Sequence, residues 1–144
     1  MENALKNISS LKMLEAIIQT SYDGIYITDG QAKTIAINNS YERITGLKRE
    51  QVLGRYMQEL VESGVISKSA TLKVLELKQP VTLHQTFNTG KNALVTGTPF
   101  FDENNKIQMV VTNVRDITEL EILKEQYIES KTENIKYKSL IEEL

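Results

Sequence analysis

The chain has 144 residues, of which 40% are hydrophobic and 25% charged, which fits one globular domain with a further segment appended. The formal net charge is only −2 and basic residues are scattered among acidic ones, so nothing favours direct binding to nucleic acid or to an anionic membrane. The absence of cysteine excludes disulfides, thiolate metal sites and a cysteine nucleophile.

The first part of the chain predicts a short amphipathic helix. Leu11, Leu14 and Ile17 recur at helical spacing, and either Ser9 or Ser10 can cap the helix at its start. The helix would flank the domain that follows it.

A β-hairpin is expected next. Ile25 and Ile27 alternate with polar or amphipathic residues, Asp29 and Gly30 form a turn signal, and a second β-rich run ends at Ile37. These two strands come early in the chain.

Short helices are predicted in the middle of the chain. Asn38 or Asn39 can cap the first of them, and Gly46 is placed to end it. Further helical pieces follow within residues 47–79, and Pro80 stops the last one.

Three strand-like runs then predict a meander: "VTLHQTF", "ALVTGTPFF" and "IQMVVTNV". In the last run Met109 and Val111 lie on one face, and Val110 and Val114 lie on the other. A sheet with one solvent-exposed face would alternate apolar and polar residues along each strand, so we expect this sheet to be covered on both sides. The middle helices would cover one face and the terminal helices the other.

The final segment changes to a coiled-coil period, because apolar residues are separated alternately by three and four positions. The seam residues, as defined here, are Leu120, Leu123, Tyr127, Ser130, Asn134, Tyr137, Ile141 and Leu144. Ser130 and Asn134 interrupt the seam with polar groups, and a buried asparagine can fix register and strand number. A single solvated helix is the alternative interpretation.

The order of elements, together with "DGIYITDG", "NNSYERITGLKREQVLGR" and "VRDIT", resembles a PAS sensor domain over roughly residues 11–118. The resemblance implies an α+β fold: a five-stranded antiparallel sheet with short helices on one face and flanking N- and C-terminal helices. We accordingly divide the chain into an N-terminal flanking helix (1–20), a PAS sensor domain (21–118) and a C-terminal signalling helix or coiled coil (119–144).

The segments "YERITGLKREQVLG", "LVTGTPFFDE" and "VVTNVRDITEL" are similar in sequence to the N-terminal sensory part of bacterial sigma-54-dependent transcriptional activators. That similarity implies a homodimer, a small-molecule signal and a downstream AAA+ output domain. The chain has no GxxxxGK[ST] phosphate loop, so we expect a sensory fragment of a longer regulator. Two alternatives are a ligand-free dimerisation scaffold and the PAS sensor of a histidine kinase.

The resemblance also implies that Asp116, Ile117 and Thr118 transmit the signal out of the domain. No glycine or proline separates the last strand from the final helix, so a stiff joint is expected there. Asp116 or Thr118 can cap the helix, with Glu119 or Glu121 completing a capping box. Efficient capping alone would also explain these residues.

A ligand pocket is a further implication of the resemblance, since PAS folds often enclose a cavity between the sheet and the middle helices. If the strand phase follows the family, the pocket residues are Ile27, Ile44, Met57, Leu72, Val95, Gly97, Val110 and Thr112. Most of them also fit a plain hydrophobic core. Gly97 leaves room on an inward strand position for a ligand or for a neighbouring backbone.

The sequence does not predict an enzyme, because it offers one histidine, no cysteine and carboxylates mostly on helix surfaces. His84 does not lie on the helix where haem-binding PAS sensors carry their ligand, which argues against haem. A covalent flavin adduct needs a cysteine and is excluded; noncovalent flavin is left open, and the cofactor is unknown. No apolar run reaches the roughly 20 residues that span a bilayer, and there is no secretory signal, so we expect a cytoplasmic protein.

Overall fold

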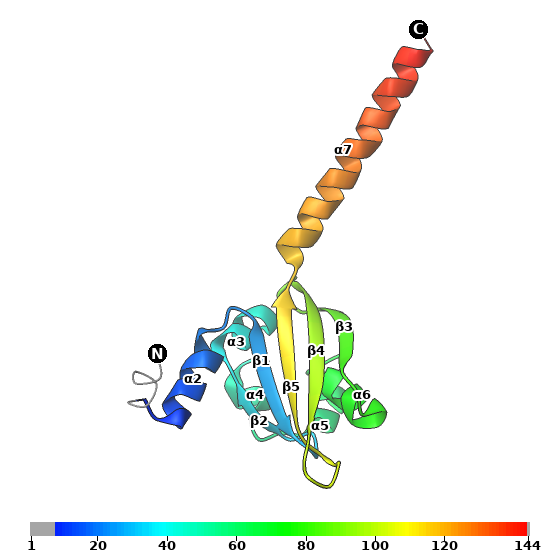
Figure 1. The fold of residues 1–144 in the computed structure, drawn as a ribbon. Coiled ribbons are helices and arrows are strands. Elements are labelled where there is room, and N and C mark those ends of the chain that lie inside the picture. Colours follow the sequence, from blue (N-terminus) through cyan, green and yellow to red (C-terminus); the bar gives the residue numbers. More distant parts are fainter. Residues whose placement is uncertain (1–7, 144) are drawn as a thin grey trace.

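The computed structural model describes residues 8–143 and has a five-stranded antiparallel sheet with strand order β2-β1-β5-β4-β3 (Figure 1). The strands are β1 (Gly24–Asp29), β2 (Thr34–Ile37), β3 (Val81–Thr86), β4 (Asn92–Phe101) and β5 (Ile107–Asp116). The helices are α2 (Ser10–Thr20), α3 (Asn39–Thr45), α4 (Arg49–Val52), α5 (Met57–Glu62), α6 (Ala70–Leu77) and α7 (Thr118–Glu142). This architecture confirms the predicted α+β PAS fold. Residues 1–7 of the expected N-terminal helix, and Leu144 of the seam, lie outside the described residues.

Local signals in the sequence fix several element ends. The Ser9 hydroxyl accepts a hydrogen bond from the Lys12 backbone N–H at the start of α2. The Asn38 side chain caps α3, where its Oδ1 accepts from the Tyr41 N–H at 2.9 Å. Gly46 ends α3 with a φ of 77°, a left-handed conformation that glycine adopts without a steric penalty.

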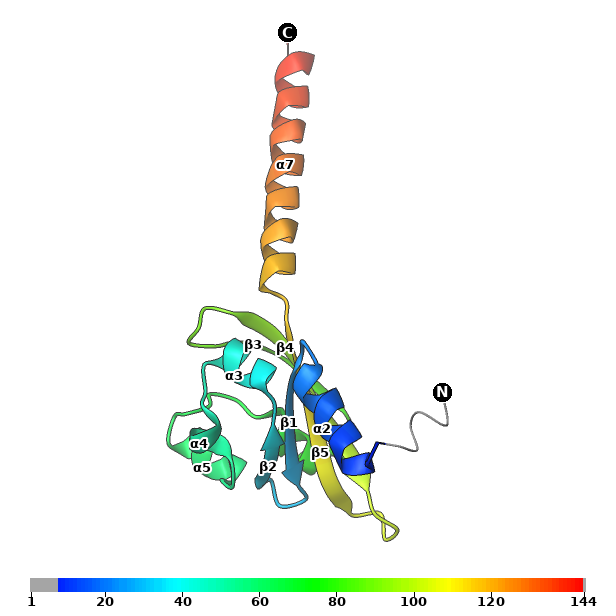
Figure 2. The ribbon, with the colours of Figure 1, turned by 90° about the vertical axis from the view of Figure 1, so that its left-hand side faces the viewer.

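Helices α3 to α6 lie on one face of the sheet, while α2 lies on the opposite side (Figure 2). Helix α7 continues in the direction of β5 and projects away from the domain (Figure 1). The expectation that both terminal helices cover the second face is therefore wrong for α7. Helix α2 lies on that side but contains no buried residue. The outer face keeps half-buried apolar side chains such as Ile27 and Met109.

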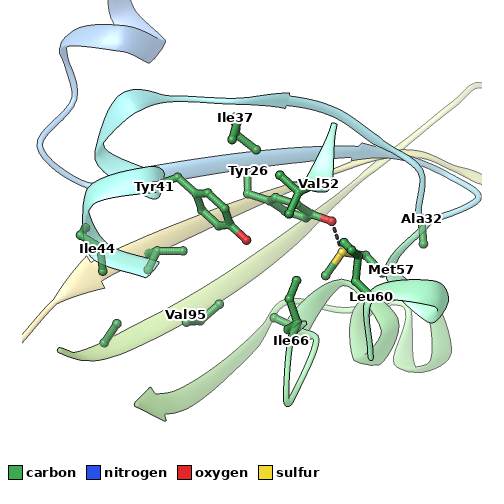
Figure 3. Close-up of a cluster of buried hydrophobic side chains, with 13 residues drawn as sticks. Tyr26, Ala32, Ile37, Tyr41, Ile44, Val52, Met57, Leu60, Ile66 and Val95 are labelled. Carbon is green, nitrogen blue, oxygen red and sulfur yellow. Dashed lines mark hydrogen bonds between the residues drawn. The ribbon is translucent and has the colours of Figure 1, made fainter. Parts of the chain in front are cut away.

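The core lies between the sheet and helices α3 to α6. Tyr26 of β1 and Tyr41 of α3 stack there with ring centroids 5.4 Å apart, and aliphatic side chains such as Ile44, Val52 and Leu60 surround the pair (Figure 3). Two large aromatic rings thus occupy much of the space where a PAS cavity is expected.

Candidate sensory cavity and exit joint

A small cavity remains between the sheet and the helices, with a volume of about 30 Å³. Its lining includes Tyr26, Tyr41, Met57, Val95 and Thr112. A space of this size is sufficient for about two or three water molecules, because one water needs on the order of 10–15 Å³. An organic ligand would enter only if side chains moved.

Three of the predicted pocket residues, Met57, Val95 and Thr112, line the cavity. Ile44 and Val110 are buried in the domain but do not line it. Leu72 is half-buried and lines a surface groove instead.

Ile27 is the pocket residue that the structure corrects. Antiparallel pairing places Tyr26 opposite Thr112 and Ile27 opposite Val111, and the buried residues of β1 are Gly24, Tyr26 and Thr28. Tyr26 therefore faces the cavity, and Ile27 lies on the outer face of the sheet. Both alternating sets of β1 contain bulky side chains, so the sequence pattern did not decide which set turned inward.

Gly97 marks a close approach of a helix to the sheet. A Cβ atom added at Gly97 would lie 2.9 Å from Cγ2 of Val74 in α6 and 3.5 Å from Cβ of Ala70. The missing side chain makes room for helix α6, so Gly97 contributes packing space rather than cavity volume.

The cavity is lined mainly by apolar side chains, with several hydroxyl groups and one charged residue, Lys68. The Tyr41 side chain is 5% exposed and directs its hydroxyl into the space between Tyr26, Ile66 and Val95 (Figure 3). The Tyr26 hydroxyl bonds to Thr34 Oγ1 at 2.9 Å and also contacts Met57 Sδ. Burial raises the pKa of both tyrosines well above the usual tyrosine range, so the hydroxyls stay protonated at physiological pH.

The exit joint connects β5 to α7 and is tied to the start of β4. The Ile117 backbone N–H donates to the Asn92 carbonyl at 2.9 Å, and the Asn92 N–H donates to Thr118 Oγ1 at 2.8 Å. Asp116 Oδ1 accepts from the Thr118 N–H at 3.0 Å and from its hydroxyl at 2.6 Å. Three consecutive residues at the joint thus have fixed partners.

The capping box expected at this helix start does not form. Ile117 is the N-cap residue, and its side chain cannot accept a hydrogen bond. Asp116 supplies the acceptor from one position earlier, and the Glu121 carboxylate bonds elsewhere: its Oε2 accepts from Asn92 Nδ2 at 2.7 Å, and its Oε1 lies 3.0 Å from His84 Nε2.

Asn92 is the site residue that sequence reasoning missed. Its backbone and side chain contact Ile117, Thr118 and Glu121, and its Oδ1 accepts from the Thr86 hydroxyl at 2.6 Å. The only signal in the sequence is weak: an asparagine near a hairpin turn. Its partners lie about 25 residues further along the chain, and only strand pairing brings them together.

The charge state of Asp116 depends on this joint. Partial burial raises the pKa of the carboxyl, but hydrogen bonds from Thr118 and the nearby Lys91 ammonium, 3.2 Å from Oδ2, outweigh burial and hold the pKa below its ordinary value. The ionised form is therefore the one that the joint stabilises.

The predicted seam residues of α7 lie on an exposed helix. Leu120, Leu123, Tyr127, Tyr137 and Ile141 are between 56% and 67% exposed, and Asn134 is exposed as well. Nothing in residues 8–143 covers these apolar side chains.

His84 belongs to the joint rather than to the cavity, because it lies on the outer face of β3 while the neighbouring Gln85 is buried. Within the described part of the chain, no group of three or more His, Cys, Asp or Glu residues is placed to hold a metal ion. None of the helices between residues 8 and 143 is both long and apolar enough to cross a membrane.

Comparison with protein families identifies a PAS domain over residues 23–119, and the chain belongs to this family. It is thus a PAS sensory domain with an exit helix. A search among curated proteins found no match.

Solved structures share the fold. An RNA-binding light-oxygen-voltage receptor is 17% identical with a TM-score of 0.62, and the match covers 89% of this chain but only 38% of the receptor. The PAS domain of BvgS from Bordetella pertussis is 18% identical with a TM-score of 0.56. The match covers 85% of this chain and 97% of that domain. A sensory box histidine kinase from Vibrio cholerae is 20% identical with a TM-score of 0.52, covering 81% of this chain and 97% of that one.

Proposed function

We propose that this chain is the cytoplasmic sensory module of a sigma-54-dependent transcriptional regulator. It forms a homodimer, senses a small-molecule signal in the cavity and relays that signal through α7 to an AAA+ ATPase output domain. The similarity of "YERITGLKREQVLG" and "VVTNVRDITEL" to the sensory parts of such regulators supports this assignment.

The observation that carries the proposal is the geometry of the exit joint. Asp116, Ile117 and Thr118 connect β5 to α7 without a glycine, and Asn92 ties Ile117 and Thr118 to β4. A joint with fixed partners passes a strand displacement on to the helix, whereas a flexible linker would absorb it. Helix pairs have discrete packing arrangements, so a small displacement can select between two output states.

The input is a change in occupancy of the cavity. Met57 lines the cavity and contacts the Tyr26 hydroxyl, and methionine adapts its shape more readily than branched side chains. Displacement of Met57 would enlarge the space next to Tyr26, whose neighbour across the sheet is Thr112 of β5. A ligand coupling of about 1–3 kcal/mol is sufficient to bias the output.

The test is an insertion series after Thr118 in the intact regulator. One added helical residue rotates the remainder of α7 by about 100°, whereas seven added residues return it close to its original phase. We expect the one-residue insertion to change regulated transcription and the seven-residue insertion to preserve the response. An unaltered response in every insertion would contradict transmission through a rigid joint.

A second candidate function is a ligand-free PAS dimerisation scaffold, and the cavity volume of about 30 Å³ favours it. Native mass spectrometry of freshly purified protein distinguishes the two. A retained small molecule supports sensing, and unliganded protein that still regulates transcription supports the scaffold.

A third candidate function attaches the same domain to a histidine kinase, as the similarity to the Vibrio cholerae kinase domain suggests. Sequencing the gene product beyond Leu144 separates an AAA+ output domain from a kinase. Either output would use the same exit joint.

A further inference from the structure

We propose that Ile66, Gln85 and Phe87 form a gate between the cavity and a polar pocket at the surface. The gate admits a small uncharged molecule with an apolar body and one hydrogen-bonding group, which pairs with the Gln85 amide. This entry route rests on the proposed function, because it takes the cavity as the sensory site. It adds the path by which the signal molecule enters and the chemical class of that molecule.

A second pocket adjoins the cavity. Its volume is about 80 Å³, against about 30 Å³ for the cavity. Ile66, Gln85 and Phe87 line both spaces, and no other described residue does, so these three side chains form the partition. The second pocket reaches the surface, since its lining includes the exposed residues Ser67 and Thr86. Displacing the partition would join the two spaces into more than three times the volume of the cavity alone.

Gln85 is the polar member of the gate, and its amide is poorly satisfied. The residue is only 5% exposed. Within residues 8–143 its side chain makes one hydrogen bond, from Nε2 to Ser67 Oγ, with a long distance of 3.4 Å. A glutamine amide offers two donor hydrogens and an acceptor oxygen, and a buried amide gains free energy when they are paired. A ligand that hydrogen-bonds to Gln85 therefore supplies what the folded chain leaves unpaired.

The other two gate side chains can move without disturbing the sheet. Ile66 belongs to the loop between α5 and α6 and points toward the tyrosine pair (Figure 3). Its backbone N–H donates to the Leu60 carbonyl at 3.1 Å, but Ser67 and Lys68 form no backbone-to-backbone hydrogen bond with any described residue. Phe87 is half-buried, and its backbone N–H bonds across the β3–β4 turn at 2.9 Å, so its ring can rotate while the turn stays in place. Local opening of such a loop requires less free energy than global unfolding.

The charges around the cavity select an uncharged ligand. Among the described residues that line the cavity, Lys68 is the only charged one. Lys68 is exposed, and its ammonium lies 3.4 Å from the His84 carbonyl on the edge strand β3, so this charge lies at the rim. An ionised ligand would lose its hydration without a counter-charge in the interior, which is strongly unfavourable. The rings of Tyr26 and Tyr41 instead offer contacts to an apolar or aromatic body.

Thiol modification tests the gate, because the natural chain has no cysteine. Val95→Cys places a single thiol on the cavity wall, and Val110→Cys is the matched reporter, since Val110 is also buried but does not line the cavity. The reagent is methyl methanethiosulfonate, which is small and uncharged. Val95→Cys should react faster than Val110→Cys. Adding Phe87→Ala or Gln85→Ala should raise the rate of Val95→Cys about tenfold and leave Val110→Cys unchanged.

Val52→Ala controls for reaction through global unfolding. Val52 is fully buried but lines neither space, so its truncation destabilises the fold without opening the gate. It should accelerate both reporters by the same factor. Gate variants that accelerate both reporters equally, or that leave Val95→Cys as slow as before, would overturn the gate.

Charged reagents and ring compounds test the ligand class. After correction for intrinsic rates with a free thiol, the anionic sulfonatoethyl and cationic aminoethyl methanethiosulfonates should modify Val95→Cys more slowly than the uncharged reagent. Benzyl alcohol should protect this thiol better than toluene, which lacks a hydrogen-bonding group, and better than benzoate, which is charged. Gln85→Leu should abolish the preference for benzyl alcohol over toluene. Equal protection by benzoate, a faster anionic reagent, or no protection by benzyl alcohol would overturn the assigned class.

The entry route and the proposed function fail in different experiments. If the gate and ligand-class results are as expected but insertions after Thr118 leave transcription unchanged, the gated cavity stands and signalling through the exit joint fails. If the insertions change transcription but the gate variants do not accelerate Val95→Cys, the signalling function stands and the gate is wrong.

Discussion

Tyr26 and Tyr41 decide how much space the sensory domain encloses. Their stacked rings and the side chain of Met57 leave a cavity of about 30 Å³ with mainly apolar walls. In a close-packed core even a change of one methylene alters the stability, so substitutions at these positions test how the cavity is filled.

Met57→Ala tests whether this side chain fills the cavity. Met57 is 4% exposed, so its truncation should lower the free energy of unfolding by about 2–5 kcal/mol while enlarging the cavity. Urea denaturation measures the loss. Met109→Ala is the matched control, since Met109 is half-buried on the outer face of β5 and should lose clearly less. Equal losses in the two variants would contradict the assignment.

Gly97→Ala tests the contact between β4 and α6. The added methyl group would lie 2.9 Å from Val74 Cγ2, and we expect overpacking to cost about 1–3 kcal/mol of unfolding free energy. Combining it with Val74→Ala removes the clashing atom, so the double variant should be more stable than the sum of the single losses predicts. Strict additivity would show that helix α6 does not limit this position.

At the level of elements, the exit joint joins three parts of the fold. β5 continues into α7, while Asn92 at the start of β4 and His84 on β3 both contact Glu121 in the first turn of α7. The start of α7 is therefore held by contacts with β3 and β4 as well as by its connection to β5. This arrangement makes the joint testable without knowledge of the signal.

Asn92→Ala should loosen the first turn of α7. The variant loses side-chain hydrogen bonds to Thr86 and Glu121, which we expect to cost about 1–2 kcal/mol. Hydrogen exchange of residues 117–121 should become faster, and mass spectrometry of the intact chain measures it. Asn104→Ala is the control, because the Asn104 backbone rather than its side chain makes the turn bond to Asp102. Unchanged exchange at the joint would show that Asn92 does not hold the helix.

Asp116 gives the joint a defined pH dependence. Its pKa is lowered in the folded protein, so the stabilisation is complete well above the unfolded value of about 3.9 and is lost as pH falls through that value and the lower folded one. Hydrogen exchange in the first turn of α7, corrected for intrinsic rates, should therefore accelerate below about pH 4. Asp116→Asn keeps an acceptor but carries no charge, so this component should vanish. Persistence of the full pH dependence in Asp116→Asn would assign it to another group.

For the whole molecule, the domain and the exit helix behave as separable parts. Deleting residues 124–144 keeps the contacts of Glu121, and the removed residues that the structure describes, 124–143, are all exposed. We expect the unfolding free energy of the domain to change by less than about 0.5 kcal/mol per chain under monomeric conditions. Sedimentation equilibrium should show a monomer for the truncated chain and a dimer for the full chain. A truncated chain that remains dimeric would place the interface on the domain instead.

Local signals made much of the fold predictable. Asn38 and Gly46 bound α3, Pro80 follows α6, and alternating apolar residues mark the strands, because each of these effects acts within a few residues. The order of the elements and the resemblance to PAS domains then predicted the five-stranded antiparallel sheet.

The candidate site was predicted in part. Met57, Val95 and Thr112 line the cavity, but Ile27 lies on the outer face and Tyr26 takes the inward position. A strand with bulky residues in both alternating sets does not reveal its phase, since pairing with β5 and packing against α3 decide it. Asn92 was missed for a related reason: its partners are distant in sequence.

The sequence by itself determined the strands and helices, the joint without glycine and the charge pattern of the exit helix, since these depend on neighbouring residues alone. Only the tertiary structure decided that two tyrosine side chains fill much of the core and that β4 holds the start of α7. It also decided that α7 projects away from the domain and does not pack on the outer face of the sheet. The physical reason is that burial and long-range hydrogen bonding depend on which segments meet, and that is settled when the sheet pairs and the helices pack on it.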